Sequence, residues 1–234
     1  MRMANLAYAE RAVNSTGGMI FFGGMTIDSL IKKAELGDAE AQYNLGCRYA
    51  NDDGVHDYAT AFVWWIKAAN QRYAEAQYKL GYMYANGQGV KQDCMRGLEW
   101  YRMAAEQGHA EAQYQLGVLY ATDFYIRKDY RCALEWWTRA AVQGHCWAQY
   151  NLGNMYLNGQ GVRCNYKQAF DWWTKAAVQG HAGAQYKLGN MYANGYGVNQ
   201  DYKKSSDWFA KAASQEYADA QNFLRICLRN RTGL

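Results

Sequence analysis

Three histidines occupy the same place in a repeated motif, and imidazoles at a regular spacing are possible metal ligands. His109, His145 and His181 each follow a Gln-Gly pair, at intervals of 36 residues. If the segments between them are packed helices, equivalent residues lie about 8–10 Å apart, whereas zinc binds its nitrogen ligands at about 2 Å. We therefore expect no metal site, and interpret the histidines as turn residues between helices.

Two other short motifs could carry chemistry but lack the companions that the chemistry needs. Gly-x-Gly pairs begin at Gly87, Gly159 and Gly195, without the third glycine and preceding strand of a dinucleotide-binding loop. Residues 29–32 read Ser-Leu-Ile-Lys, the Ser-x-x-Lys pattern of penicillin-binding proteins, but the accompanying Lys-Thr-Gly is absent. These patterns favour turns and a helix surface, so we predict no catalytic residue, no cofactor and no enzymatic activity.

One tryptophan departs from the residues at equivalent positions. Trp147 stands where the other copies of the motif have a polar or small residue, namely Glu40, Glu75, Glu111, Gly183 and Asp219. The repeat therefore does not require a large ring at this position. Trp147 is either a partly exposed chance substitution or a binding anchor, because tryptophan is enriched at binding hot spots.

A repeat of about 36 residues positions all of these side chains. Ala-Gln-Tyr-x-Leu-Gly begins at Ala41, Ala76, Ala112, Ala148 and Ala184. Aromatic pairs follow in register, at 64–65, 100–101, 136–137, 172–173 and 208–209. Apolar residues in both segments recur at i, i+4 and i+8, which predicts two helices per unit. A period in this range indicates stacked helical hairpins rather than a closed globule.

These motifs, with Asn-Gly-x-Gly-Val between the two helices and Gln-Gly-His after the second, resemble the Sel-1-like repeat, a relative of the tetratricopeptide repeat. The resemblance covers about residues 26–229. It implies an all-α, α/α fold, a right-handed α-solenoid (superhelix) of helix-turn-helix repeats used as an adaptor or scaffold between proteins. Two turns depart from the pattern, at residues 51–55 and 121–126.

The repeat arithmetic also predicts the domain organisation. We expect residues 1–25 to form a flexible N-terminal tail and residues 26–230 a single solenoid. Within it, residues 26–37 form a capping helix, 38–217 form five repeats, and 218–230 form a C-terminal capping helix.

Composition narrows the partners and the compartment. The 234 residues include 25 basic and 21 acidic side chains, which are interspersed and leave a net charge of +4, so nucleic-acid binding gains little support. No apolar run approaches the ~18 residues of a membrane span. The six cysteines share no repeat position, which favours free thiols in a reducing compartment. We expect a cytoplasmic protein, or an exported one if a signal peptide precedes this sequence.

The tetratricopeptide resemblance implies that the first helices line a concave face. The candidate binding residues on that face are Lys79, Tyr82, Tyr114, Gln115, Val118, Trp147, Tyr150, Asn151, Asn154 and Asn190. The recurring tyrosines, Tyr114 and Tyr150 among them, form either a wall of rings or a packing contact between repeats. The apolar third turn, Phe124, Tyr125 and Ile126, is a second, separate candidate surface.

Three functions fit these features. The leading one is a non-catalytic scaffold for protein–protein interaction, which binds a peptide or protein segment in the concave groove. The alternative is an inhibitor or immunity-type protein that neutralises one toxin or enzyme, since the resembled family includes bacterial examples of that kind. The third is an enzyme acting on cell-wall or β-lactam substrates, which would need a convergent nucleophile and base that the sequence does not reveal.

Overall fold

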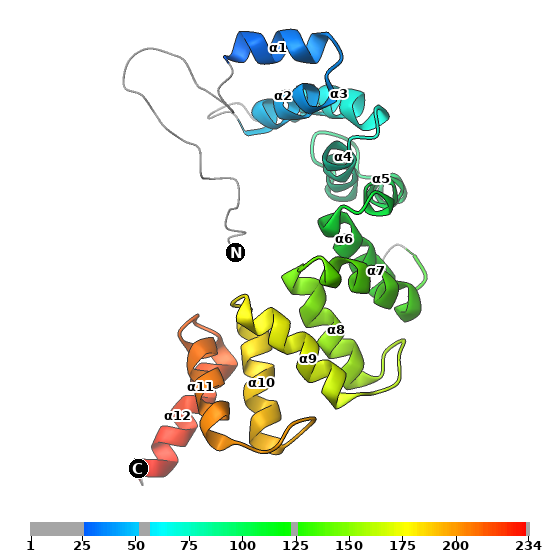
Figure 1. Ribbon diagram of the computed structural model, residues 1–234. Helices are drawn as coiled ribbons and strands as arrows, with labels where there is room; N and C mark the ends of the chain where they lie inside the picture. The colour runs from blue at the N-terminus through cyan, green and yellow to red at the C-terminus, as the bar shows by residue number, and fades with distance from the viewer. Residues whose placement is uncertain (1–25, 52–56, 123–125, 233–234) are drawn as a thin grey trace, which may run out of the picture. The chain divides into compact units, whose positions relative to one another are not determined.

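The computed structural model describes residues 26–51, 57–122 and 126–232, with side chains as far as residue 225. Within these ranges the chain forms twelve helices and no strand (Figure 1). The helices are α1 Ile27–Glu35, α2 Ala39–Asn51, α3 Tyr58–Asn70, α4 Ala74–Asn86, α5 Cys94–Glu106, α6 Ala110–Ala121, α7 Tyr130–Val142, α8 Cys146–Asn158, α9 Tyr166–Val178, α10 Ala182–Asn194, α11 Tyr202–Ala213 and α12 Ala218–Thr232. The tail expected at residues 1–25 lies outside the described residues.

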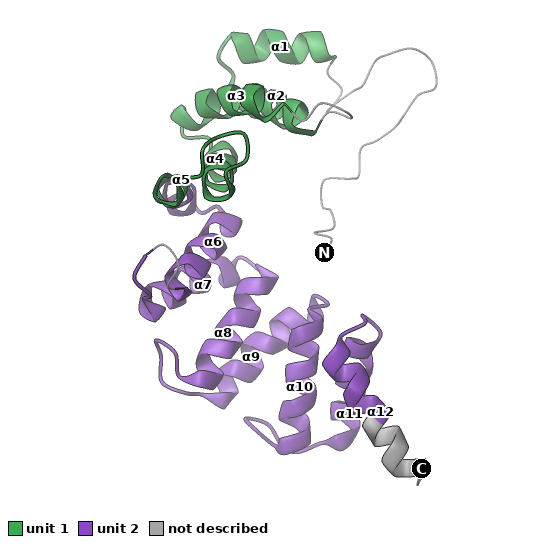
Figure 2. Cartoon of the chain, turned by 180° about the vertical axis from the view of Figure 1, so that it is seen from behind, with its two compact units in different colours: residues 1–100 green, residues 101–234 purple. Residues whose placement is uncertain are grey.

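The helices divide between two units, residues 1–100 and residues 101–234, and the division falls within α5 (Figure 2). In the first unit, α1 packs on α2, α2 on α3, and α3 on α4. In the second unit, each helix from α6 to α11 packs on the next helix in the chain, as far as α12. Packing between successive helices is the defining property of an α-solenoid, so the predicted fold class is confirmed. The grouping of residues 26–230 into one domain with capping helices stays a prediction.

The polar turn motifs begin and end the helices. Helix α8 ends at Gly159, whose φ of 67° is left-handed, a conformation that glycine adopts without strain. Gly161 is also left-handed, and a Cβ there would lie 2.5 Å from the Tyr130 carbonyl oxygen, so the turn packs closely on the preceding repeat. Helix α9 then starts where the Asn165 side chain accepts a hydrogen bond from the Gln168 backbone N–H at 3.0 Å. Asn-Gly-x-Gly-Val is therefore a structural turn.

A tryptophan packed on a glycine joins the two helices of a repeat. Trp173 of α9 is 1% exposed, and its ring lies against Gly153 of α8, where a Cβ would be 2.3 Å from the indole nitrogen. The indole N–H donates to the backbone carbonyl of Tyr150 at 3.1 Å. The same contact and hydrogen bond occur where Trp65 meets Gly46 and where Trp137 meets Gly117.

Buried glutamines join one repeat to the next. Gln149, from the Ala-Gln-Tyr motif, donates through Nε2 to the carbonyl of Ala141 at 3.0 Å, and so caps the end of α7. Gln179, from the Gln-Gly-His motif that ends the same repeat, donates to Gln149 Oε1 at 2.8 Å. The same glutamine pair forms between Gln143 and Gln113, and between Gln215 and Gln185. The glutamines of the Ala-Gln-Tyr and Gln-Gly-His motifs are therefore explained by the same polar contact inside the helix stack.

None of the helices in the described ranges is long and apolar enough to cross a membrane. Among the described side chains the free thiols are Cys47, Cys94, Cys132, Cys146 and Cys164.

Candidate functional site

The three aligned histidines cap helices. The Nδ1 atoms of His109, His145 and His181 accept hydrogen bonds from the backbone N–H groups three residues later, at 3.1, 3.2 and 3.1 Å respectively. Because Nδ1 accepts, the proton of each neutral ring is on Nε2. The side chains thus begin α6, α8 and α10, which refines the prediction of turn histidines. Within the described residues, no three His, Cys, Asp or Glu side chains gather as metal ligands would.

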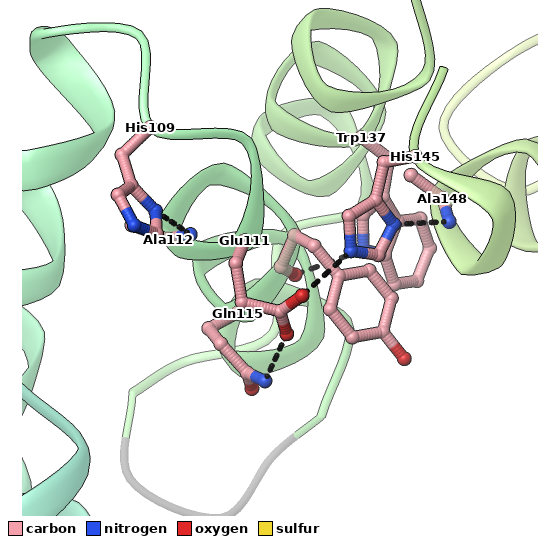
Figure 3. Close-up of polar contacts among 8 residues, drawn as sticks. His109, Glu111, Ala112, Gln115, Trp137, His145 and Ala148 are labelled. Carbon is pink, nitrogen blue, oxygen red and sulfur yellow. Dashed lines mark hydrogen bonds and ion pairs between the residues drawn. The ribbon is translucent and has the colours of Figure 1, made fainter. Parts of the chain in front are cut away.

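His145 uses its second nitrogen to bind a carboxylate of the preceding repeat. Its Nε2–H donates to Glu111 Oε2 at 2.9 Å, while Gln115 Nε2 donates to Glu111 Oε1 at 3.1 Å (Figure 3). The Tyr114 ring stacks on the imidazole, with ring centroids 4.6 Å apart. Burial acts to raise the pKa of the Glu111 carboxyl, but the hydrogen bonds from His145 and Gln115 lower it below its ordinary value. Glu111 is therefore an ionised, fixed carboxylate.

One repeat further on, Trp147 stands where the carboxylate would be. Its ring meets the His181 ring at 75°, with centroids 4.4 Å apart, and Tyr150 stacks on the same imidazole at 4.3 Å. His181 Nε2 is buried and has no hydrogen-bond partner among the described atoms. Burial lowers the pKa of His181, against a smaller opposing effect of its own backbone, so the imidazole is neutral. The ring contact between Trp147 and His181 thus takes the place of the hydrogen bond between Glu111 and His145.

Trp147 remains half in solvent. Its side chain is 52% exposed, although the His181 and Tyr150 rings cover part of it. In the next repeat the equivalent residue is Gly183, where a Cβ would lie 3.2 Å from His181 and 3.3 Å from Tyr150. Gly183 is buried, and a side chain there would be crowded by both rings.

Equivalent residues form a row across the unit. Each is the second residue of its helix: Glu111 of α6, Trp147 of α8, Gly183 of α10 and Asp219 of α12. We call these four residues the variable row. Glu111 stands one repeat before Trp147, and Asp219 stands two repeats after it. The row therefore offers an exposed apolar ring with a carboxylate one repeat away, which is suited to binding rather than to bond-breaking chemistry.

The tyrosines predicted for the concave face pack between repeats. Tyr114 and Tyr150 are half-buried, and each stacks on the histidine that caps the next first helix. Tyr186 contacts Tyr217 at the same place, with ring centroids 5.4 Å apart. Of the two interpretations of these rings, the packing contact between repeats is the one that the structure shows.

The polar and aliphatic candidates of the second unit are also half-buried. Val118 packs against the apolar core formed by α7 and α8. Asn151 forms a hydrogen bond with Tyr114, and Asn190 Nδ2 donates to the Tyr186 carbonyl at 3.2 Å. Asn154 is half-buried. Their role in binding stays a prediction, and Trp147 is the most exposed of the candidates in this unit.

The two remaining concave candidates, Lys79 and Tyr82, belong to α4 in the first unit. Tyr82 is 44% exposed and Lys79 Nζ lies 6.0 Å from the Trp65 ring centroid. Both line a hollow of about 110 Å³ whose wall also includes Tyr58 and Met83. Whether this hollow takes part in binding stays a prediction.

The second candidate surface is only partly described. Phe124 and Tyr125 lie outside the described residues, and Ile126 is half-buried. The surface stays a prediction.

Sequence reasoning missed the Glu111–His145 pair and the neutral state of His181. The two partners are 34 residues apart, so no local motif contains both. One signal was available: each histidine stands three residues before the alanine of Ala-Gln-Tyr, which is the spacing of a side chain that caps a helix.

Comparison with known proteins agrees with the predicted resemblance. The family model described as Sel1 repeat matches residues 39–73, 74–109, 110–145, 148–181 and 182–217. These matches occupy more than half of the chain and coincide with the helix pairs of the structure. No curated protein matches the chain.

Several solved structures share the fold. A protective antigen present in uropathogenic Escherichia coli strains, displaying an SLR fold, is 40% identical with a TM-score of 0.83; the match covers 88% of this chain and 44% of that one. A Sel1 repeat protein from Oxalobacter formigenes is 32% identical with a TM-score of 0.73, over 84% of this chain and 76% of that one. An immunity protein from Pseudomonas aeruginosa, at 24% identity and a TM-score of 0.50 over 79% and 68%, shares the fold alone. The chain thus spans less than half the length of the Escherichia coli antigen.

Proposed function

Because this chain belongs to the Sel1-repeat family, whose helical repeats commonly mediate protein–protein interaction, we propose that it is a non-catalytic scaffold that binds a segment of another protein through Trp147 and the variable row. The family supports the general role of a scaffold. The surface and the kind of partner are the proposal.

The exposure of Trp147 carries this proposal. A large aromatic side chain that is 52% exposed supplies much apolar area to a partner at a small cost in conformational entropy. Other repeats fold with glutamate or glycine at this position, so folding of the repeat does not require the ring. The contacts with His181 and Tyr150 hold the ring in place before a partner arrives, which reduces the entropy lost on binding.

The polar chemistry around Trp147 supports binding over catalysis. His145 and His181 each use Nδ1 to cap a helix, so neither is available there as a general base. Glu111 is ionised and holds hydrogen bonds from two side chains. Ser29, of the Ser-x-x-Lys pattern, lies in α1 on the first unit.

A capture experiment tests the proposal. The full chain, a Trp147→Ala variant and a Tyr202→Ala variant are immobilised and exposed to an extract of the organism that encodes the protein. Tyr202 is 70% exposed on α11, a second helix, and is the matched aromatic control. We expect a partner held by the parent and the control but lost by Trp147→Ala, with binding weakened by about 2 kcal/mol or more.

Equal capture by all three chains would move the binding site away from Trp147. The stability of Trp147→Ala, measured by denaturation, should fall by less than about 1 kcal/mol, as for other exposed positions. A loss of stability with unchanged capture would make Trp147 a structural residue. Capture of one toxin or enzyme whose activity is then inhibited would favour the inhibitor or immunity-type function over the general scaffold.

A further inference from the structure

The chemistry of the variable row also selects the residue that a partner presents to it. We infer that the bound segment carries an arginine or lysine side chain, which lies on the Trp147 ring with Glu111 as the nearest carboxylate of the variable row. This inference rests on the proposed function and specifies its partner.

The first helices of this unit offer few charges, and those in the variable row are negative. Glu111 is the only charged residue of α6, and α8 has none. Lys187, the only charged residue of α10, has its ammonium 6.0 Å from the Trp173 ring centroid. In α12, Asp219 begins the helix, and the first arginine, Arg225, lies about 9 Å further along the axis. A positive side chain on Trp147 therefore has the Glu111 carboxylate one repeat away, whereas Asp219 is two repeats away.

The chain already uses the same contact on its second helices. Arg139 lies 4.6 Å from the Trp136 ring centroid, Lys175 lies 4.2 Å from that of Trp172, and Lys211 lies 4.2 Å from that of Trp208. Tryptophan is the preferred ring for such cation–π contacts. Trp147 is more than half exposed, and within the described part of the chain no cation lies over it. The ring can therefore accept one from outside.

The neighbours of Trp147 favour a cation over the other kinds of side chain. The His181 imidazole is neutral because its Nδ1 caps α10, so it does not repel a positive group. Glu111 is 32% exposed, with lone pairs beyond the two hydrogen bonds it accepts. A carboxylate in the partner would be repelled by Glu111. A purely apolar segment that covered Glu111 would desolvate its carboxylate without pairing it.

The test compares a cationic peptide with a neutral peptide of nearly the same shape. Two blocked heptapeptides, Gly-Ser-Gly-X-Gly-Ser-Gly, carry arginine or citrulline at X, which have nearly the same shape but differ in charge. Each is titrated into the full chain in the millimolar range while nuclear magnetic resonance follows the indole N–H of Trp147, assigned from its absence in Trp147→Ala. We expect a saturable shift with the arginine peptide, and binding about three- to five-fold weaker with citrulline.

Charge variants complete the test. Glu111→Gln keeps an oxygen that accepts from His145 and should weaken arginine-peptide binding several-fold, whereas Asp219→Asn, two repeats from Trp147, and Glu135→Gln on the exposed surface of α7 should not. Equal binding of arginine and citrulline peptides, no saturable shift with either, or no effect of Glu111→Gln would each overturn the inference. Partner capture that depends on Trp147 but not on Glu111 would overturn it while leaving the proposed function intact. Capture that is independent of Trp147 would remove both.

Discussion

Individual side chains in this protein act mainly through one neighbour in the adjacent helix or repeat. Trp173 covers Gly153, His145 holds Glu111, and Trp147 covers His181. Each contact joins two residues that are distant in sequence. Changing one side chain should therefore have a local effect whose size depends on how completely that contact is buried.

Gly153 should not tolerate a side chain. Gly153→Leu would place its Cβ about where the Trp173 ring now lies, 2.3 Å from the indole nitrogen in the present structure. We expect a loss of about 1–3 kcal/mol in the free energy of unfolding, measured by denaturant titration. Glu135→Leu, at an exposed position of α7, is the control for a leucine added to a helix. A Gly153→Leu variant as stable as the control would mean that this glycine faces solvent.

His181 should make stability depend on pH. In the folded chain burial lowers its pKa, while in the unfolded chain the value is the ordinary 6.5. Below that value the unfolded chain binds a proton that the folded chain does not, so stability falls as the pH drops. Asparagine can also cap a helix, so His181→Asn should lose less stability than the parent between about pH 7 and pH 5. Identical losses in denaturant titrations at the two pH values would contradict this expectation.

At the scale of the elements, the glutamine pairs matter most because they satisfy helix ends inside the stack. Gln149 is 4% exposed and bonds both the Ala141 carbonyl and Gln179. An end of α7 that lost this cap would keep an unpaired carbonyl away from water.

Gln149→Leu should therefore destabilise the chain although leucine is similar in size and more apolar. We expect a cost of about 1–3 kcal/mol, because the Ala141 carbonyl and the Gln179 amide would both lose a partner. Gln168→Leu changes an exposed glutamine of α9 and serves as the control. Denaturant midpoints compare the two, and equal midpoints would show that water can replace the missing cap.

The sequence predicted most of the elements and only part of the site. The Asn-Gly-x-Gly-Val turns and the aromatic pairs indicated where helices end and how two helices meet, because those effects are local or repeat in every unit. Trp147 could be singled out because it breaks a pattern. The Glu111–His145 pair and the bare backbone at Gly183 could not, since they depend on how one repeat lies against the next.

At the scale of the whole molecule, each helix pair depends on its neighbours. At the C-terminal end, Phe209 of α11 is fully buried and its ring centroid lies 4.0 Å from that of Phe223 in α12. Without α12 this ring, together with Ala212, would face water. Stability in such an arrangement is close to a sum over units and their shared interfaces.

Removing residues 218–234 should thus weaken the nearest helices first. Hydrogen exchange should show lost protection in α11 and α10, and little change in α6 and α7, because the latter share no interface with α12. Uniform loss of protection across residues 101–217 would instead show that this unit unfolds as one cooperative body.

The glutamine caps also bear on how such a chain can change in length over generations. At the junctions between repeats, the glutamine of Ala-Gln-Tyr donates to the backbone carbonyl eight residues before it, so a repeat copied within the gene meets a donor and an acceptor that already fit. Duplication of the segment that holds Trp147 would add a second ring on the next hairpin without any new packing problem. A single amino-acid insertion within a helix would shift the donor out of reach of its acceptor. The protein can therefore lengthen by duplication of whole repeats rather than by insertion of single residues, and each duplication can add a binding position.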